Sequence, residues 1–125
     1  MEALIIALLP ILIQVESGGR VDAVGDNGAA VGILQIHKIL VDDVNIIWDT
    51  DYTYNDRQDA RKSAEMCILF LYHYGQVYER KTGHAANMEV LSRIWNGGPL
   101  GYKKKATEKY WEKVERVYNG HRQTQ

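Results

Sequence analysis

Apolar residues along this chain recur at intervals of three or four, the spacing typical of α-helices. The first such run, residues 3–17, is apolar almost throughout and is followed by Gly18-Gly19. Glycine readily adopts the left-handed conformation that ends a helix, so this pair predicts the helix end. Pro10 lies inside the run and is expected to kink or break the helix, because proline lacks the N–H of an interior helical bond.

Four later segments also have helical spacing. Asp59 and Asn87 precede two of them, and both side chains can accept hydrogen bonds from the free N–H groups of a first helical turn. Thr107 is predicted to cap the last helix in the same way, and residues 96–99 break the helix before it. The predicted helices cover residues 38–47, 59–80 and 88–95, and a last stretch that follows Thr107.

Two segments between the helices lack this periodicity. Residues 18–36 are rich in Gly and Asp, and Asp26-Asn27-Gly28 favours the tight turn of a short β-hairpin. Residues 49–57 predict a polar loop that contains two tyrosines. We therefore expect residues 1–125 to form one compact, mainly α-helical domain, with a short β-hairpin or loop region after the first helix.

The composition narrows the class of protein. The 125 residues are 46% hydrophobic and 25% charged, which is ordinary for a globular domain large enough to bury a core. A net charge of -1 provides no basic surface for nucleic acid. Cys67 is the single cysteine, so it excludes an internal disulfide and is expected in the core. The four histidines lack metal-ligand spacing, and we expect no metal or cofactor.

The apolar segment at residues 3–13 allows more than one interpretation. It is shorter than the roughly 20 residues that a transmembrane helix needs, although its length suits the core of a signal peptide. No Lys or Arg precedes it, and no small-residue cleavage site follows it. We therefore expect no stable membrane insertion, no signal peptide, and a retained helix that packs against the helix at 59–80.

Charge is distributed unevenly along the chain. Residues 1–56 contain nine acidic and two basic residues, a net charge of -7, whereas residues 103–125 contain three acidic and seven basic residues, a net charge of +4. The basic end is either a solvated face of the last helix or a surface that faces an anionic polymer.

Glu16 is the most informative ionisable residue, because it ends an otherwise apolar helix. Burial disfavours its anion, and so does the partial negative charge of a helix C-terminus. Both effects raise the pKa of a carboxyl group toward the range that suits a general acid. On position alone, a solvated surface glutamate is the simpler interpretation.

Three motifs occur in order along the chain and favour a catalytic role for Glu16 over a solvated surface position. The motifs are Glu16-Ser17, Gly32-x-x-Gln35-Ile36 and Ile94-Trp95-Asn96-Gly97-Gly98-Pro99. Together they resemble the soluble lytic transglycosylases and the related goose-type lysozymes, and the resemblance covers residues 3–118. It implies the α+β lysozyme-like fold and cleavage of peptidoglycan glycan strands.

The resemblance assigns roles to individual residues. It implies that Glu16 is the catalytic acid and base and that Ser17 orients it through a hydrogen bond. Gln35 would line the sugar groove, and Asn96 would face the substrate near Glu16. Trp95 stands where the family usually has tyrosine, so an aromatic side chain is kept but a phenol hydroxyl is not.

The reaction outcome depends on a second carboxylate. The run GDNGAAVGILQI resembles the goose-type pattern in which an aspartate holds the hydrolytic water, and Asp26 matches that position. His37 stands where a second goose-type aspartate falls. Asp26 is equally explained as a residue of a tight turn. Without a held water, Glu16 alone would act as acid and then base, and would form a 1,6-anhydromuramoyl end.

Aromatic residues suggest further sugar contacts. Tyr52 and Tyr54 lie in the polar loop and are expected to stack on sugar faces. We expect a monomeric enzyme that cleaves the β-1,4 bond between N-acetylmuramic acid and N-acetylglucosamine in the bacterial cell wall. A goose-type-like hydrolase and a non-catalytic glycan-binding module are the alternatives, and both a bacteriophage endolysin and a bacterial enzyme fit the sequence.

Overall fold

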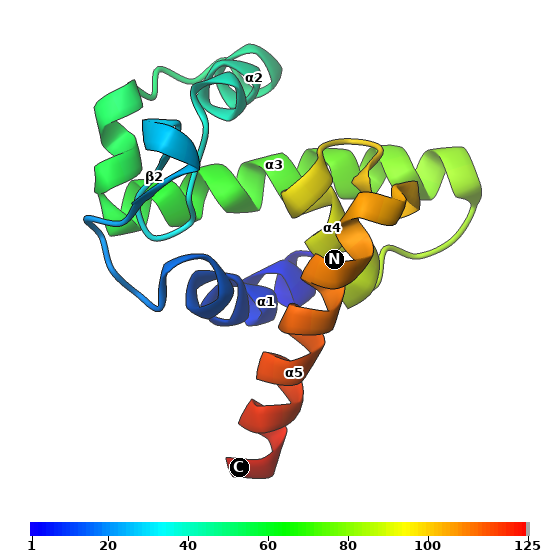
Figure 1. Ribbon diagram of the computed structural model, residues 1–125. Coiled ribbons are helices and arrows are strands. Elements are labelled where there is room, and N and C mark those ends of the chain that lie inside the picture. The colour runs from blue at the N-terminus through cyan, green and yellow to red at the C-terminus, as the bar shows by residue number, and fades with distance from the viewer. Residues whose placement is uncertain (125) are drawn as a thin grey trace.

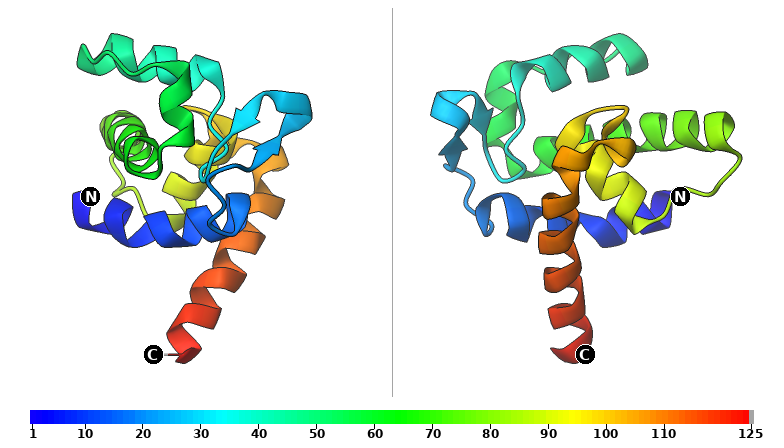
Figure 2. Two further views of the ribbon diagram at one scale, coloured as in Figure 1. Left: turned by 90° about the vertical axis from the view of Figure 1, so that its left-hand side faces the viewer. Right: turned by 45° about the vertical axis from the view of Figure 1, so that its right-hand side comes forward.

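The protein is described by a computed structural model that covers residues 1–124 (Figure 1). The long helix α3 lies between α2 on one side and α1 on the other, and the C-terminal half of α5 extends away from the other helices (Figure 2). The α-helices of these residues are α1 (Glu2–Ser17), α2 (Lys38–Trp48), α3 (Ala60–Thr82), α4 (Met88–Gly97) and α5 (Glu108–Thr124). The mainly α-helical class predicted from the sequence is thus confirmed.

The first helix ends where the sequence predicts. Gly18 is left-handed, with φ 66°, and its N–H bonds to the carbonyl oxygens of Ile13 and Gln14. No break occurs at Pro10, because α1 runs through it without interruption. Pro10 and Ile6 are both exposed, so water can reach the Ile6 carbonyl that proline leaves without a helical partner.

Two of the three predicted N-caps are confirmed. Asp59 accepts a hydrogen bond from the Lys62 N–H, and Asn87 accepts one from Val90, each at 2.9 Å. The predicted cap at Thr107 is wrong. This residue ends a 3₁₀ segment, η4 (Lys105–Thr107), that leads directly into α5, and its hydroxyl donates to the Gly101 carbonyl at 2.7 Å.

The irregular segments also contain ordered structure. Strands β1 (Val24–Gly25) and β2 (Ala30–Val31) pair antiparallel around a 3₁₀ turn, η1 (Asp26–Gly28), which confirms the hairpin. The segment predicted as a polar loop is partly helical, because η2 (Tyr54–Gln58) begins inside it. A capping box between Thr53 and Asp56 stabilises that turn.

The core forms where α1, α2 and α4 pack against α3, and α5 packs against α1 and α4. Helix α1 packs against α3 as predicted, and Cys67 is fully buried there. No helix within residues 1–124 is long and apolar enough to span a membrane. The largest fully buried side chains include those of Leu8, Leu12, Met66, Leu71, Leu91 and Ile94.

Candidate active site

A groove of about 880 Å³ opens above the end of α1. Its walls come from the five α-helices of residues 1–124 and from the hairpin, so it forms only when these elements have packed together. Four carboxylates line it, together with His37 and Lys113 as the basic side chains. These carboxylates belong to Glu16, Asp26, Asp42 and Asp43.

Glu16 lies in the last turn of α1, half-buried at the groove. The Tyr110 hydroxyl donates a hydrogen bond of 2.7 Å to its Oε2 atom. Burial raises the pKa of Glu16 above its ordinary value of 4.5, and this outweighs the hydrogen bonds from Tyr110 and Trp95, which lower it. The negative charge of Asp26 raises the pKa further, and His37 lowers it slightly. Glu16 therefore keeps its proton to a higher pH than a solvated glutamate.

The structure holds Tyr110 in place through the loop that precedes α5. Arg93 on α4 donates to the Thr107 hydroxyl and to the Lys104 carbonyl, each at 2.8 Å. Gly101 lies so close to α4 that an added Cβ would be 2.0 Å from the Arg93 carbonyl oxygen. These contacts fix the start of α5 against α4, so the tyrosine hydroxyl stays at the Glu16 carboxylate.

Trp95 and Asn96, near the end of α4, both line the groove. The Trp95 ring is buried and packs edge-on against Phe70, with 5.7 Å between ring centroids. Its indole N–H lies close enough to Glu16 to lower the pKa of that carboxyl group. Asn96 is exposed, so its amide is available to a ligand in the groove. Trp95 has no phenol hydroxyl, and the hydroxyl that contacts Glu16 belongs to Tyr110 instead.

Ser17 has a different role from the one that the resemblance implied. Its hydroxyl donates to the Ile33 carbonyl at 2.8 Å and to the Ile13 carbonyl at 3.3 Å, and it accepts from the Gly19 N–H. Among the hydrogen bonds of residues 1–124, none joins Ser17 to the Glu16 carboxylate. The serine instead ties the end of α1 to the loop that carries Gln35.

Gln35 lines the groove and also shapes it. Its side-chain N–H groups donate to the carbonyls of Gly32 at 2.9 Å and Ala23 at 3.1 Å. Its backbone is left-handed, with φ 52°, which a tight loop requires. The spacing of Gly32 and Gln35 thus builds the loop between β2 and α2.

Asp26 and His37 face each other at the groove, with 3.0 Å between Oδ2 and Nε2. Asp26 begins the η1 turn and is 68% exposed, and His37 is 46% exposed. Asp26 is therefore both a residue of the tight turn and a residue that lines the groove. One of its carboxylate oxygens is already engaged by the imidazole.

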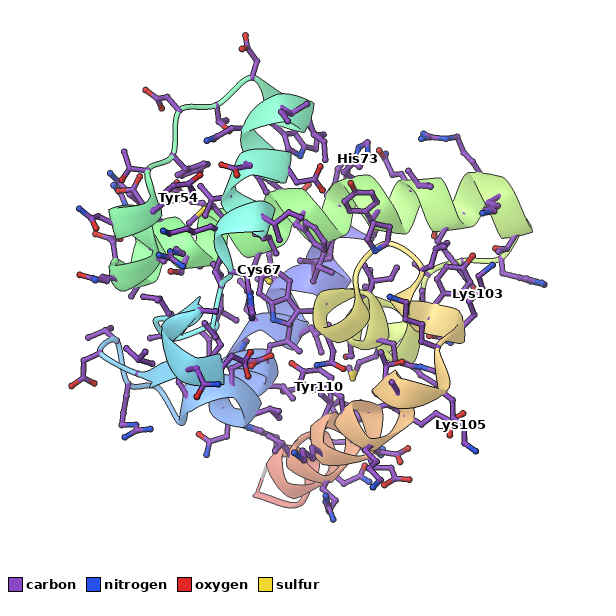
Figure 3. All side chains as sticks on the ribbon, turned by 45° about the horizontal axis from the view of Figure 1, so that its top comes forward. Tyr54, Cys67, His73, Lys103, Lys105 and Tyr110 are labelled. Carbon is purple, nitrogen blue, oxygen red and sulfur yellow. The ribbon has the colours of Figure 1, made fainter. Side chains whose placement is uncertain are left out.

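Tyr52 and Tyr54 are not among the groove-lining residues of the described chain. The Tyr52 hydroxyl donates to Glu65 at 2.8 Å, and the Tyr54 hydroxyl donates to Asp42 at 2.9 Å. Figure 3 shows Tyr54 beside α2 and η2, well away from Tyr110 on α5. Tyr54 therefore supports the α2 wall of the groove through Asp42.

Sequence reasoning missed most of this α2 wall. Ile39 and Ile46 are 76% and 81% exposed, and both line the groove beside Asp42 and Asp43. Isoleucines seven positions apart occupy one face of a helix. Other apolar residues of α2 already fill its buried face. A second apolar face on the same helix was therefore the sequence feature that could have predicted this wall of the groove.

The raised pKa of Glu16 has a consequence for stability. An acid whose folded pKa lies above its unfolded value makes the protein less stable as pH rises from about 4.5 through the folded pKa. The wild type should therefore lose stability between pH 4 and pH 7 relative to Glu16→Gln, which cannot ionise. Urea unfolding of both proteins at the two pH values measures this. An equal difference at both pH values would contradict the shift.

Within residues 1–124, no group of three or more His, Cys, Asp and Glu side chains is placed to hold a metal ion. A half-buried acid with a raised pKa, at the floor of an open groove, suits proton donation to a bond within a long polymer. The fold and this groove thus suit acid–base chemistry on an extended substrate.

A protein-family model described as "Transglycosylase SLT domain" matches residues 2–117. The match spans nearly the whole chain, so the protein belongs to this family of lytic transglycosylases, which cleave glycosidic bonds of peptidoglycan. The enzyme class inferred from the sequence motifs is thereby confirmed, with the cell wall as its site of action. A search of curated proteins finds no match.

Proposed function

We propose that the protein cleaves the β-1,4 bond between N-acetylmuramic acid and N-acetylglucosamine, with Glu16 as acid and then base. The observation that carries this proposal is the Glu16 carboxyl group, half-buried in the groove with a raised pKa and bonded to Tyr110. The chain acts as one domain and as a monomer, and reaches the wall by export or by phage delivery.

In the first step, protonated Glu16 donates its proton to the glycosidic oxygen. The bond between this oxygen and the muramoyl C1 breaks, and the N-acetylglucosamine unit leaves with a free hydroxyl. The substrate's own 2-acetamido oxygen supports the positive charge at C1. The hydrogen bonds from Tyr110 and Trp95 favour the carboxylate that this step produces.

In the second step, the Glu16 carboxylate takes the proton of the muramoyl C6 hydroxyl. The C6 oxygen then bonds to C1, which closes the 1,6-anhydro ring, and Glu16 is again protonated. No water is consumed. Burial suits both steps, because a raised pKa lets one carboxyl group release and regain a proton near neutral pH.

The position of Asp26 supports closure of this ring over hydrolysis. A hydrolase would need a carboxylate that is free to activate a water opposite the acid. Here His37 engages Asp26 Oδ2 and competes with a water for that oxygen, while the side chain as a whole is 68% exposed. The competing hydrolase proposal is favoured by one observation, since Asp26 is close enough to Glu16 for its charge to raise the pKa of that residue.

Asp26→Asn separates the two outcomes. We expect the variant to release the same anhydro product as the wild type, with a stability loss of about 0.5–2 kcal/mol if the turn weakens as a helix does on losing its cap. Mass spectrometry of the released muropeptides measures the product. If the wild type yields only reducing muramoyl ends, and the variant no longer yields them, the protein is a hydrolase that uses Asp26.

A further inference from the structure

A second pocket, which we call the side pocket, lies directly beside the groove. Its volume is about 460 Å³, and it shares His37 and Ile39 with the groove. It is bounded by the η1 turn, the first residues of α2 and the η2 segment, and none of its lining residues is acidic. These lining residues are Asn27, Gly28, Ala29, His37, Lys38, Ile39 and Arg57.

Arg57 brings a buried positive charge to the side pocket. The residue is only 8% exposed, and Nε donates to the Tyr54 carbonyl at 2.8 Å. Nη1 donates to the carbonyls of Ile36 at 3.1 Å and Ala29 at 3.3 Å. In residues 1–124, no carboxylate lies within ion-pair distance of this guanidinium. The carbonyl bonds hold the side chain in place but do not neutralise its charge.

Further positive groups converge on the same pocket. Lys38 Nζ lies 5.1 Å from the Tyr54 ring centroid, and the Arg57 guanidinium carbon lies 5.8 Å from the same centroid. Helix α2 begins here without a side-chain cap from His37, so its positive end also faces this region. The nearby carboxylate of Asp26 is engaged by His37.

The groove and the side pocket therefore differ in charge. Four carboxylates line the groove, whereas the side pocket is lined by Arg57 and Lys38 and by no acidic residue. His37 lines both and is paired with Asp26. The sugar rings of a glycan strand are neutral, but the muramoyl unit carries a lactyl-linked peptide that bears carboxylates. The carboxylates of the groove repel such a group, whereas the positive charges of the side pocket attract it.

We propose that the side pocket binds a carboxylate of the peptide attached to the muramoyl unit while the glycan strand lies in the groove. This inference rests on the proposed function, because it takes a peptidoglycan strand as the substrate. Arg57 provides a rigid guanidinium that suits carboxylate binding, and Lys38 adds a second positive charge at the pocket.

The test compares three substrates: strands that carry their peptides, strands from which an amidase has removed the peptides, and strands whose peptide carboxylates have been converted to amides. For the wild type we expect kcat/KM on the first to exceed that on the other two by about tenfold, the size typical of one charge-assisted contact.

Lys38→Glu is the informative variant, because Arg57 also holds three backbone carbonyls and its replacement can unfold the region. Lys38→Glu should reduce the ratio between peptide-bearing and bare strands to about one. The matched control is Lys105→Glu, the same charge change at an exposed residue far from Tyr54 in Figure 3. This control should keep the wild-type ratio.

The outcomes separate this inference from the proposed function. A wild-type ratio near one, or an unchanged ratio in Lys38→Glu, overturns the side-pocket inference while strand cleavage continues. The inference is also overturned if the wild type prefers amidated strands to bare strands and Lys38→Glu loses that preference too. The pocket would then recognise the peptide without its carboxylate. Failure of the wild type to cleave any of the three strands overturns the proposed function itself.

Discussion

Glu16→Gln is expected to lower the rate of peptidoglycan cleavage by at least about 10²–10⁴-fold, the contribution of general acid–base catalysis. The amide can still accept the hydrogen bond from Tyr110, so the fold and the groove should persist. It can neither donate a proton to the glycosidic oxygen nor take one from the C6 hydroxyl. Release of muropeptides from purified peptidoglycan measures the rate.

The matched control for this variant is Glu2→Gln. Glu2 begins the helix that Glu16 nearly ends, is exposed, and undergoes the same chemical change. It should retain wild-type activity. A Glu16→Gln protein that keeps half of the wild-type rate would show that another group supplies the proton.

Gly32→Ala is expected to destabilise the fold by about 2–5 kcal/mol, from left-handed strain and from overpacking together. Gly32 has φ 88°, and an added Cβ would lie 1.9 Å from the backbone carbonyl oxygen of Arg57. Backbone is not free to move aside as the end of a flexible side chain is. Urea unfolding measures the loss, and the groove should lose its Gln35 loop as well.

Gly28→Ala separates strain from overpacking. Gly28 has a similar φ of 96°, but nothing lies within 4 Å of an added Cβ. This variant should lose only about 1–2 kcal/mol, the strain of a left-handed alanine. If the two variants lose equal stability, the close approach of the Arg57 backbone is not the reason why position 32 requires glycine.

The helices and their ends were largely predictable from the sequence, because the signals are local. Asp59 and Asn87 cap the helices that directly follow them, and Gly18 ends the helix that directly precedes it. Thr107 failed as a predicted cap because its hydroxyl donates to the Gly101 carbonyl, six residues earlier in the segment between α4 and α5. Pro10 failed as a predicted break because it lies on an exposed side of α1.

The candidate site was predictable only in part. The motifs pointed to Glu16, Gln35, Trp95 and Asn96, and the structure brings these residues to one groove. Tyr110 was not predicted as a partner of Glu16, because 94 residues separate the two and only the packing of α5 against α1 and α4 joins them.

The same limit applies to side chains with competing partners. Ser17 turns to the Ile33 carbonyl, and Tyr52 turns to Glu65. Neither partner can be read from the spacing of residues along the chain. Sequence patterns predict which residues are available for a hydrogen bond, whereas the tertiary packing decides which bond forms.

Mass spectrometry of the ends released from purified peptidoglycan tests the central claim most directly. If Glu16 acts alone as acid and then base, the wild type produces 1,6-anhydromuramoyl ends, each one water lighter than a reducing end, and Glu16→Gln produces neither. Reducing ends as the main wild-type product would contradict the claim, because they require a water that this mechanism does not use.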